Sequence, residues 1–271
     1  MLGHLFYYDF RETGRKLGMM YLVLAATCLL TNLFFSVFSS TNQVIESISV
    51  ILMIVDFALA IALIVLTVVG CIERFYKNCY GPEGYLTFTL PVHPWQILLS
   101  KVLSSALLIV CTLAVLSGCV LLAIPFGLWG QVDMGGFFSE FGQMLQLVGY
   151  GNVAGVSLNI LAAVALNLFV TILMIYLAIS IGQLFSNHKV ALSFIFFFVI
   201  ESVIGILTGL VFTGTAYTVS ETGMELSLDT MNGALYAVNG FIGGQSLWML
   251  LLSAAMFFGT DYIMRKHLNL E

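Results

Sequence analysis

The chain has 271 residues, of which 60% are hydrophobic and only 8% are charged, and its formal net charge is −5. An average soluble domain has about 25% charged residues, so this chain cannot cover a globular surface with polar groups. The composition therefore predicts an integral membrane protein. The acidic net charge argues against nucleic-acid binding, and the lipid bilayer is the surrounding that we expect.

The first segment, residues 1–16, is amphipathic and is not an expected span. Apolar residues recur near helical spacing between charged ones. Glu12 stands three and four residues before Arg15 and Lys16, which is a favourable pairing on a helix. We expect an N-terminal interfacial helix on the inner membrane surface. A frayed polar tail is the alternative interpretation.

Six apolar segments are each long enough to cross a bilayer as a helix, which takes about 20 residues. No strand-like alternation recurs, so we expect an all-α membrane protein with one transmembrane domain over residues 1–271, and not a β-barrel. No cleavable signal peptide is evident, because the first apolar segment is too long. The expected spans are residues 17–38, 47–72, 98–125, 154–186, 190–213 and 245–264.

The basic residues indicate how the spans are oriented. All nine lie at the N-terminus, between spans two and three, between spans four and five, or at the C-terminus. The other loops hold acids and no basic residue, so the positive-inside rule places both termini in the cytosol. The basic residues are Arg11, Arg15, Lys16, Arg74, Lys77, Lys101, Lys189, Arg265 and Lys266, and the acids of the outer loops are Glu46, Asp133, Glu140, Glu221, Glu225 and Asp229.

The loop between spans two and three contains an apolar segment of helical length. Gly81 and Pro82 can begin a short helix, and Glu83 suits the positive end of its dipole. Pro91 and Pro94 end it. A helix this short is not stable alone. It packs either on the inner ends of its own spans or the headgroups, or in a groove of a cytosolic partner, and the residues themselves leave both interpretations open.

The string GPEGYLTFTLPVHPWQILLSK, residues 81–101, is similar to a segment of permease subunits in bacterial type-2 ABC exporters. The rest of the chain resembles that family in its architecture. The resemblance implies a coupling helix at about 82–91 that inserts into an ABC ATP-binding subunit, a dimer with a second permease copy or a paralogue, and a bacterial plasma membrane. The positions that match are Glu83, Gly84, Tyr85, Leu86, Thr89, Leu90, Pro91, Val92, Ser100 and Lys101, and the coupling residues would be Glu83, Gly84, Tyr85, Leu86, Phe88, Leu90 and Pro91.

The chain carries no sequence pattern for nucleotide or metal chemistry. It has no GxxxxGK[ST] phosphate loop, and its cytosolic segments are too short to fold a nucleotide-binding domain. We therefore expect no enzyme activity and no cofactor on this chain, with ATP and Mg²⁺ on a separate ATPase subunit. None of the histidines has metal-ligand spacing, so no metal site is expected. The histidines are His4, His93, His188 and His267.

Two acids, Asp56 and Glu201, lie inside expected spans. A charge there is costly, so each is expected to face a partner or water. Glu201, Gly205 and Gly209 follow at four-residue steps, and the two glycines form a small-xxx-small pattern that favours close helix contact. The resemblance places this span at the permease dimer interface beside the translocation path. In the alternative, both acids are structural and a protonated Glu201 forms a hydrogen bond across helices. Its candidate partners are Asn32 and Asn167.

The segment ahead of the sixth span mixes acids with a glycine-rich apolar part, NGALYAVNGFIGGQSLW. Glycine lowers helix stability by about 1 kcal/mol per residue relative to alanine, so the glycines argue against a separate span. We expect a re-entrant or interfacial helix that leads into span six.

These observations predict the permease subunit of an ATP-driven exporter. Peptides, drugs and lipid-like molecules are candidate cargo, and the acids of the outer loops favour hydrophobic or cationic peptides. One alternative is a polytopic accessory or sensor protein that binds a cytosolic partner without transport. The other is a proton-coupled secondary transporter that uses Asp56 and Glu201 as proton sites.

Overall fold

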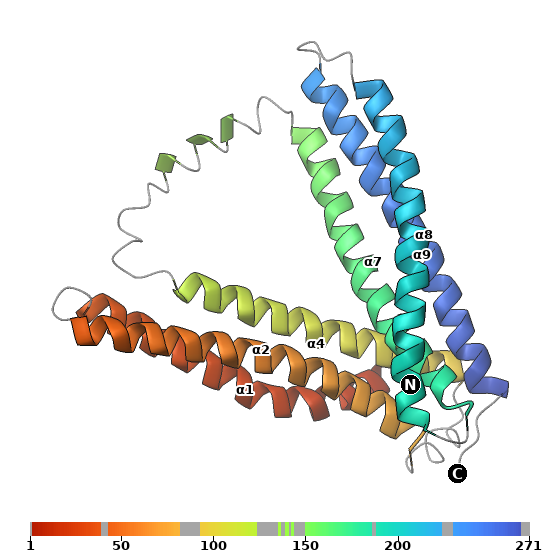
Figure 1. Cartoon of the computed structure of the whole chain (residues 1–271), viewed down its shortest axis with the longest axis horizontal. Helices are drawn as coiled ribbons and strands as arrows, with labels where there is room; N and C mark the ends of the chain where they lie inside the picture. Colours follow the sequence, from red (N-terminus) through yellow and green to blue (C-terminus); the bar gives the residue numbers. More distant parts are fainter. Residues whose placement is uncertain are drawn as a thin grey trace. The chain divides into compact units, whose positions relative to one another are not determined.

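The computed structural model of this chain is all-helical in the residues that it describes, with no strand among them. The helices are α1 (Leu2–Phe38), α2 (Gln43–Cys79), α4 (Pro94–Ala123), α7 (Tyr150–Gly182), α8 (Lys189–Gly223) and α9 (Thr230–Lys266) (Figure 1). The described residues are 2–38, 43–81, 93–123, 135–136, 139–140, 142–143, 150–185, 188–223 and 230–266. The expected coupling helix at 82–91 lies outside them, and so do all of its coupling residues.

All six helices are long and apolar enough to cross a membrane, which confirms the six predicted spans. The predicted and observed span ends differ by at most seven residues. The observed spans are Thr13–Phe34, Val50–Cys79, Pro94–Leu121, Ala154–Gly182, Lys189–Val211 and Asn239–Lys266.

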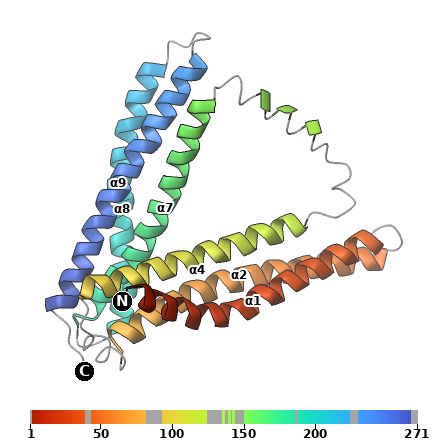
Figure 2. The same ribbon diagram turned by 180° about the vertical axis from the view of Figure 1, so that it is seen from behind.

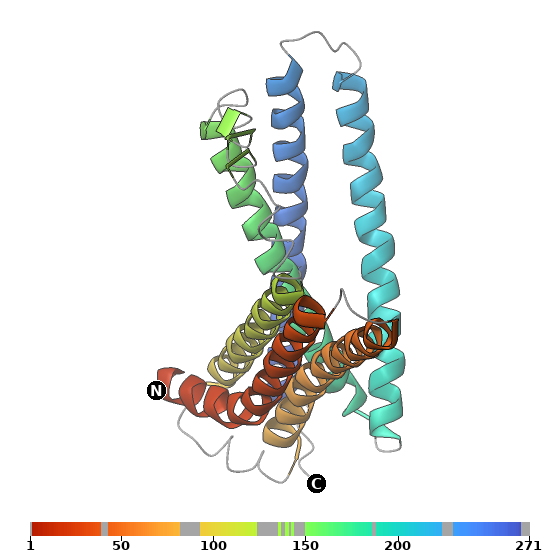
Figure 3. The same cartoon turned by 90° about the vertical axis from the view of Figure 1, so that its left-hand side faces the viewer.

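Two helices are longer than the sequence predicts. The segment expected as a separate interfacial helix is continuous with the first span in α1, although its N-terminal part turns away from the rest (Figure 3). The segment expected as a re-entrant or interfacial helix is continuous with the sixth span in α9. Each segment is therefore helical and joined to its span, and the interfacial position of both stays a prediction. Neither segment contains proline, and in lipid a break would leave backbone groups without hydrogen bonds, which costs more than the glycines do.

The contacts group the chain into two compact units, which are described separately. Unit 1 comprises residues 1–78 and 91–134 and contains α4 with α1 and nearly all of α2, side by side in two opposite views (Figures 1 and 2). The backbones of α1 and α4 pack closely, whereas the contacts of α2 with both are made by side chains. The single transmembrane domain stays a prediction.

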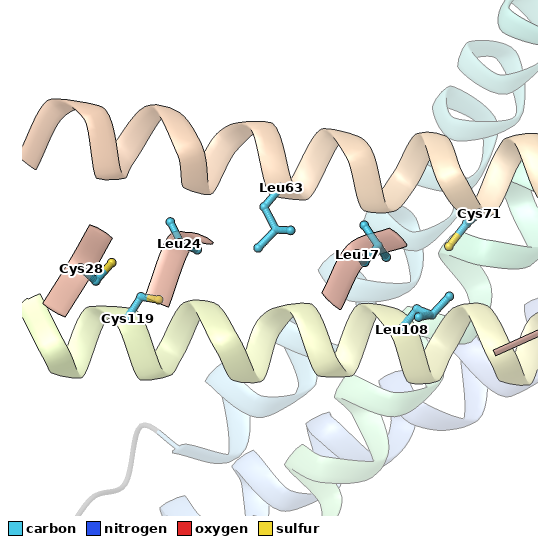
Figure 4. Close-up of a cluster of buried hydrophobic side chains, with 7 residues drawn as sticks. All are labelled: Leu17, Leu24, Cys28, Leu63, Cys71, Leu108 and Cys119. Carbon is cyan, nitrogen blue, oxygen red and sulfur yellow. The ribbon is translucent and has the colours of Figure 1, made fainter. Parts of the chain in front are cut away.

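The core of unit 1 combines apolar and small polar side chains. All three helices contribute to an apolar cluster in its interior (Figure 4). The Thr112 hydroxyl on α4 lies 2.8 Å from the Tyr21 hydroxyl on α1 and 3.1 Å from the Thr67 hydroxyl on α2. One buried hydroxyl therefore links all three helices. The cluster is Leu17, Leu24, Cys28, Leu63, Cys71, Leu108 and Cys119.

Unit 2 comprises residues 79–90 and 135–271, and α7 contacts both α8 and α9 in it. The Asn159 amide donates to the Asn239 side-chain oxygen between α7 and α9. The Trp248 indole donates to the Thr208 hydroxyl over 3.1 Å, which joins α9 to α8. Side-chain hydrogen bonds therefore connect α9 to each of its neighbours.

The turn from α7 to α8 brings two backbones close together. A Cβ atom at Gly182 would lie 2.8 Å from the backbone nitrogen of Ser193 and 2.9 Å from its Cα. His188, which precedes α8, has a φ of 57°, in the left-handed region. The corner therefore requires glycine at position 182, because any side chain there would displace the start of α8.

Candidate functional site

The segment expected to contact a partner leaves unit 1 at the end of α2 and returns at the start of α4. Pro94 is the first residue of α4, where its fixed φ suits the helix and its missing N–H is not needed. The Gln96 N–H donates to the His93 carbonyl over 2.9 Å and closes the first turn. The third span thus begins four residues before its predicted start at 98.

The first turns of α4 are deeply packed. Ser100 and Lys101, which end the string that resembles the exporter permeases, are 0% and 2% exposed. Lysine is rarely fully buried unless its ammonium is paired or hydrogen-bonded. The end of the string is therefore built into the helix packing and is not a surface loop.

Arg74 is the second buried cation of unit 1, and it is 6% exposed. Its guanidinium on α2 donates to the Ser104 hydroxyl on α4, with longer contacts of 3.4 Å to the Ser105 hydroxyl and 3.5 Å to the Thr13 hydroxyl on α1. In the sequence, both residues count as basic markers of orientation, and Lys101 also ends the string. The sequence analysis did not predict that they are buried.

A helical stripe could have indicated the buried position of Arg74. Thr67, Cys71 and Arg74 are spaced four and three residues apart, so they share one face of α2. All three are buried. On α4 the hydroxyls of Ser104 and Ser105 lie opposite Arg74, and that of Thr112 lies opposite Thr67. Polar residues at helical spacing inside two apolar spans therefore mark the face where those spans meet.

Tyr80 directly follows α2, outside the membrane-spanning segment, and precedes the predicted coupling helix at 82–91. Burial raises the pKa of the Tyr80 phenol above its ordinary value of 10.0. The phenol is therefore neutral at physiological pH.

Asp56 is half-buried within unit 1 and has a partner that its sequence context did not predict. The Thr31 hydroxyl on α1 lies 2.7 Å from Asp56 Oδ2, and 3.0 Å from the Thr27 carbonyl. Asp56 Oδ1 is buried without a hydrogen-bond partner among the described residues. This arrangement gives Asp56 a structural contact between α2 and α1.

Glu201 lies on α8 in a different setting. Glu201, Gly205 and Gly209 share one face, as their spacing predicts, and all three are exposed. A Cβ atom at either glycine would have no neighbour within 4 Å. In the described part of the chain Glu201 forms no hydrogen bond or ion pair, so it does not pair with Asn167 on the neighbouring α7, and Asn32 belongs to unit 1.

The predicted close helix contact at Gly205 and Gly209 is therefore not made within the described residues of unit 2. No residue in the most apolar stretch of the fifth span is buried. An unpaired carboxyl group facing lipid would be costly. Within the described residues of unit 2 nothing covers this face.

A further acid at the end of α9 did not stand out in the sequence. Asp261 is buried, and the Arg265 guanidinium lies 2.9 Å from its Oδ2, one helical turn away. Asp261 Oδ1 is buried without a hydrogen-bond partner among the described residues. Across the described ranges no group of three or more His, Cys, Asp or Glu residues is placed to hold a metal ion.

Comparisons with protein-family models, with curated proteins and with solved structures found no match to this chain. Any functional assignment therefore rests on the geometry of the described helices and on the residues of the string.

Proposed function

We propose that this chain is the membrane-spanning permease subunit of an ATP-driven exporter, similar to the type-2 ABC exporters of bacterial plasma membranes. Two copies, or this chain and a paralogue, form the translocation path. A separate ABC subunit binds ATP and Mg²⁺ and docks on the segment at 82–91. Six helices that can span a membrane and the string at residues 81–101 support this proposal.

The observation that carries the proposal is the way the string enters the bundle. The segment leaves from the end of α2, and its last residues, Ser100 and Lys101, are buried in the first turns of α4. A push on the segment would therefore act on packed helix ends. This is the mechanical requirement for a coupling element, because motion passes between subunits through rigid elements.

The uncovered face of α8 supports the dimer. Glu201, Gly205 and Gly209 present a carboxyl group and two close-approach positions with no neighbour within the described chain. Small residues let two membrane helices approach closely. A second subunit packed there would bury this face and place Glu201 beside the path between the subunits.

The proposal is tested by gentle purification of the tagged chain from its own host, followed by mass spectrometry of the proteins that accompany it. We expect an ABC ATP-binding subunit in stoichiometric amount. An intact, folded chain that brings no such subunit would contradict the proposal and favour the accessory or sensor protein.

Hydrophobic or cationic peptides are the cargo that we favour, because the outer loops carry acids without basic residues and Glu201 adds a carboxyl group. Such peptides should stimulate ATP hydrolysis by the purified complex. If no cationic amphipathic peptide changes the hydrolysis rate, this cargo class is wrong. The permease assignment is then still tested by the ATP-binding subunit that accompanies the chain.

Asp56 Oδ1, buried without a hydrogen-bond partner among the described residues, favours one second candidate, a proton-coupled secondary transporter. Liposomes that contain this chain alone decide between the two. Gradient-driven uptake without ATP would support the second candidate, whereas dependence on ATP and a second subunit would exclude it.

A further inference from the structure

We propose that Arg74 is the positioning residue that holds together the two helices flanking the segment at 82–92, so that a push on the segment moves α2 and α4 as one body. This inference rests on the proposed coupling function. It concerns residues within unit 1 only.

Arg74 lies near the point where force would enter the bundle. It lies five residues before the end of α2, and Ser104 lies ten residues after the start of α4. At 1.5 Å per residue the guanidinium link is about 8 Å along α2 and about 15 Å along α4 from the segment. Force entering at either helix end thus reaches the link within three turns.

The chemistry of the link suits a clamp between helices. A guanidinium presents five donors in a planar fork, so Arg74 can bond Ser104, Ser105 and Thr13 at once. At 6% exposure the charge has little water around it, and its hydrogen bonds are correspondingly strong. A single ammonium group could not reach all three hydroxyls with this geometry.

A second polar link between α2 and α4 lies farther from the segment than Arg74 does. The backbones of α1 and α4 pack closely, but α2 joins them through side chains. Another polar link between α2 and α4, Thr67 with Thr112, is neutral and lies about two turns farther from the segment. Near the segment, Arg74 therefore supplies a charged link between the flanking helices.

Lys77 provides a matched control on the same helix. It carries the same charge and lies closer to the segment, but its side chain is 58% exposed, and its ammonium pairs with Glu73 at 2.5 Å within α2. If only positive charge near the segment mattered, Lys77→Gln would have at least as large an effect as Arg74→Gln. The proposal predicts that it has none.

The experiment places spin labels at Val69→Cys and His93→Cys, both exposed positions of unit 1, in the full chain in lipid nanodiscs. Val69 lies on α2 and leaves the Glu73–Lys77 pair intact. Electron paramagnetic resonance then reports the distance between the C-terminal part of α2 and the start of α4. The chain without these two substitutions is labelled in parallel to measure reaction at native cysteines. Four of those are buried and Cys111 is half-buried.

We expect one narrow distance in the otherwise unchanged chain, and the same distance after Mg-ATP is added to the complex with its ATPase. Arg74→Gln should raise the fraction of molecules with separated helix ends by about tenfold, the effect of losing one charged hydrogen bond. Arg74→Lys should fall between the two, and Lys77→Gln should match the unchanged chain.

A second expected result distinguishes the loss of this link from a general loss of packing. The Arg74→Gln chain should still bind its ATPase in full amount, while Mg-ATP now changes the distance between the helix ends. If Arg74→Gln does not insert, Ser104→Ala with Ser105→Ala removes the acceptors instead, with the same expectation.

The inference is overturned if Arg74→Gln, or the double alanine variant, keeps the narrow distance, or if Lys77→Gln broadens it equally. Failure of the proposed function has a different signature. In that case no ATPase accompanies any form of the chain, and the nanodisc measurement without ATP still decides whether Arg74 holds α2 and α4 together.

Discussion

Unit 1 and unit 2 each contain three long apolar helices, yet they are held together differently. In unit 1, buried hydroxyls and the Arg74 guanidinium link α1, α2 and α4 from the inside. In unit 2, α8 packs on α7 near the tight corner at Gly182 and accepts an indole hydrogen bond from Trp248, while the described residues leave its Glu201 face uncovered. The difference teaches that helices of similar hydropathy can be linked from the inside in one unit and leave a face uncovered by described residues in the other.

The largest effect that we expect comes from the corner of unit 2. Gly182→Ala would force its Cβ against the backbone of Ser193, and overpacking of this kind costs on the order of 3 kcal/mol. The melting temperature of the purified chain measures the loss. Gly240→Ala, in a helix with no atom within 4 Å of the added Cβ, is the control and should leave the melting temperature unchanged or raise it slightly. Equal effects would show that α8 is not anchored at this corner.

A smaller effect is expected inside unit 1. Thr31→Val removes the hydroxyl that contacts Asp56 and should lower the free energy of unfolding by about 1–2 kcal/mol. Thr171 is exposed, and its hydroxyl bonds the Asn167 carbonyl of its own helix. Thr171→Val is thus a matched control, expected within about 0.5 kcal/mol. If Thr31→Val costs no more than this control, Asp56 does not join α2 to α1.

A large side chain on the Glu201 face of α8 should not destabilise the single chain. Gly205→Phe meets open space, so we expect the free energy of unfolding to change by about 0.5 kcal/mol or less. If the face pairs with a second subunit, the same substitution should block close approach and lower the dimer fraction seen by mass photometry. An unchanged dimer would place the subunit contact elsewhere.

The smallest effect at neutral pH concerns Tyr80. Burial raises the pKa of its phenol in the folded chain above 10.0, so the folded state favours the neutral form. The resulting stability is complete below pH 10 and is lost as the pH rises through the folded pKa. Tyr80→Phe cannot ionise, so its melting temperature should fall less steeply above the ordinary phenol pKa of 10.0. Parallel curves for both forms would contradict this.

The sequence predicted the spans well, because about 20 consecutive apolar residues have few alternatives to a membrane helix. It did not show that the segment before the sixth span continues into that span as one helix, because helix propensities measured in water overstate the cost of glycine in lipid. The shared face of Glu201 and Gly205 followed from spacing, whereas what covers that face did not. Spacing within one helix shows which residues share a face, but it does not show which other helix packs on that face.

The same limit explains why Arg74 was missed. Its charge fits the positive-inside rule as well as that of Lys77 does, yet one side chain is buried and the other exposed. That difference depends on Ser104, which lies 30 residues away on another helix. The Thr31 partner of Asp56 was unpredictable for the same reason.

The central claim is that the segment at 82–91 binds an ATPase subunit, and one comparison tests it directly. The amount of ABC ATP-binding subunit that accompanies the tagged chain is measured for the unchanged form and for Tyr85→Ala with Leu86→Ala. Leu184→Ala with Phe185→Ala, an exposed apolar pair at the turn between α7 and α8, is the matched control. We predict that both double variants insert normally into the membrane and that only Tyr85→Ala with Leu86→Ala loses the ATP-binding subunit. Undiminished association would contradict the account, because the ATPase would then dock elsewhere.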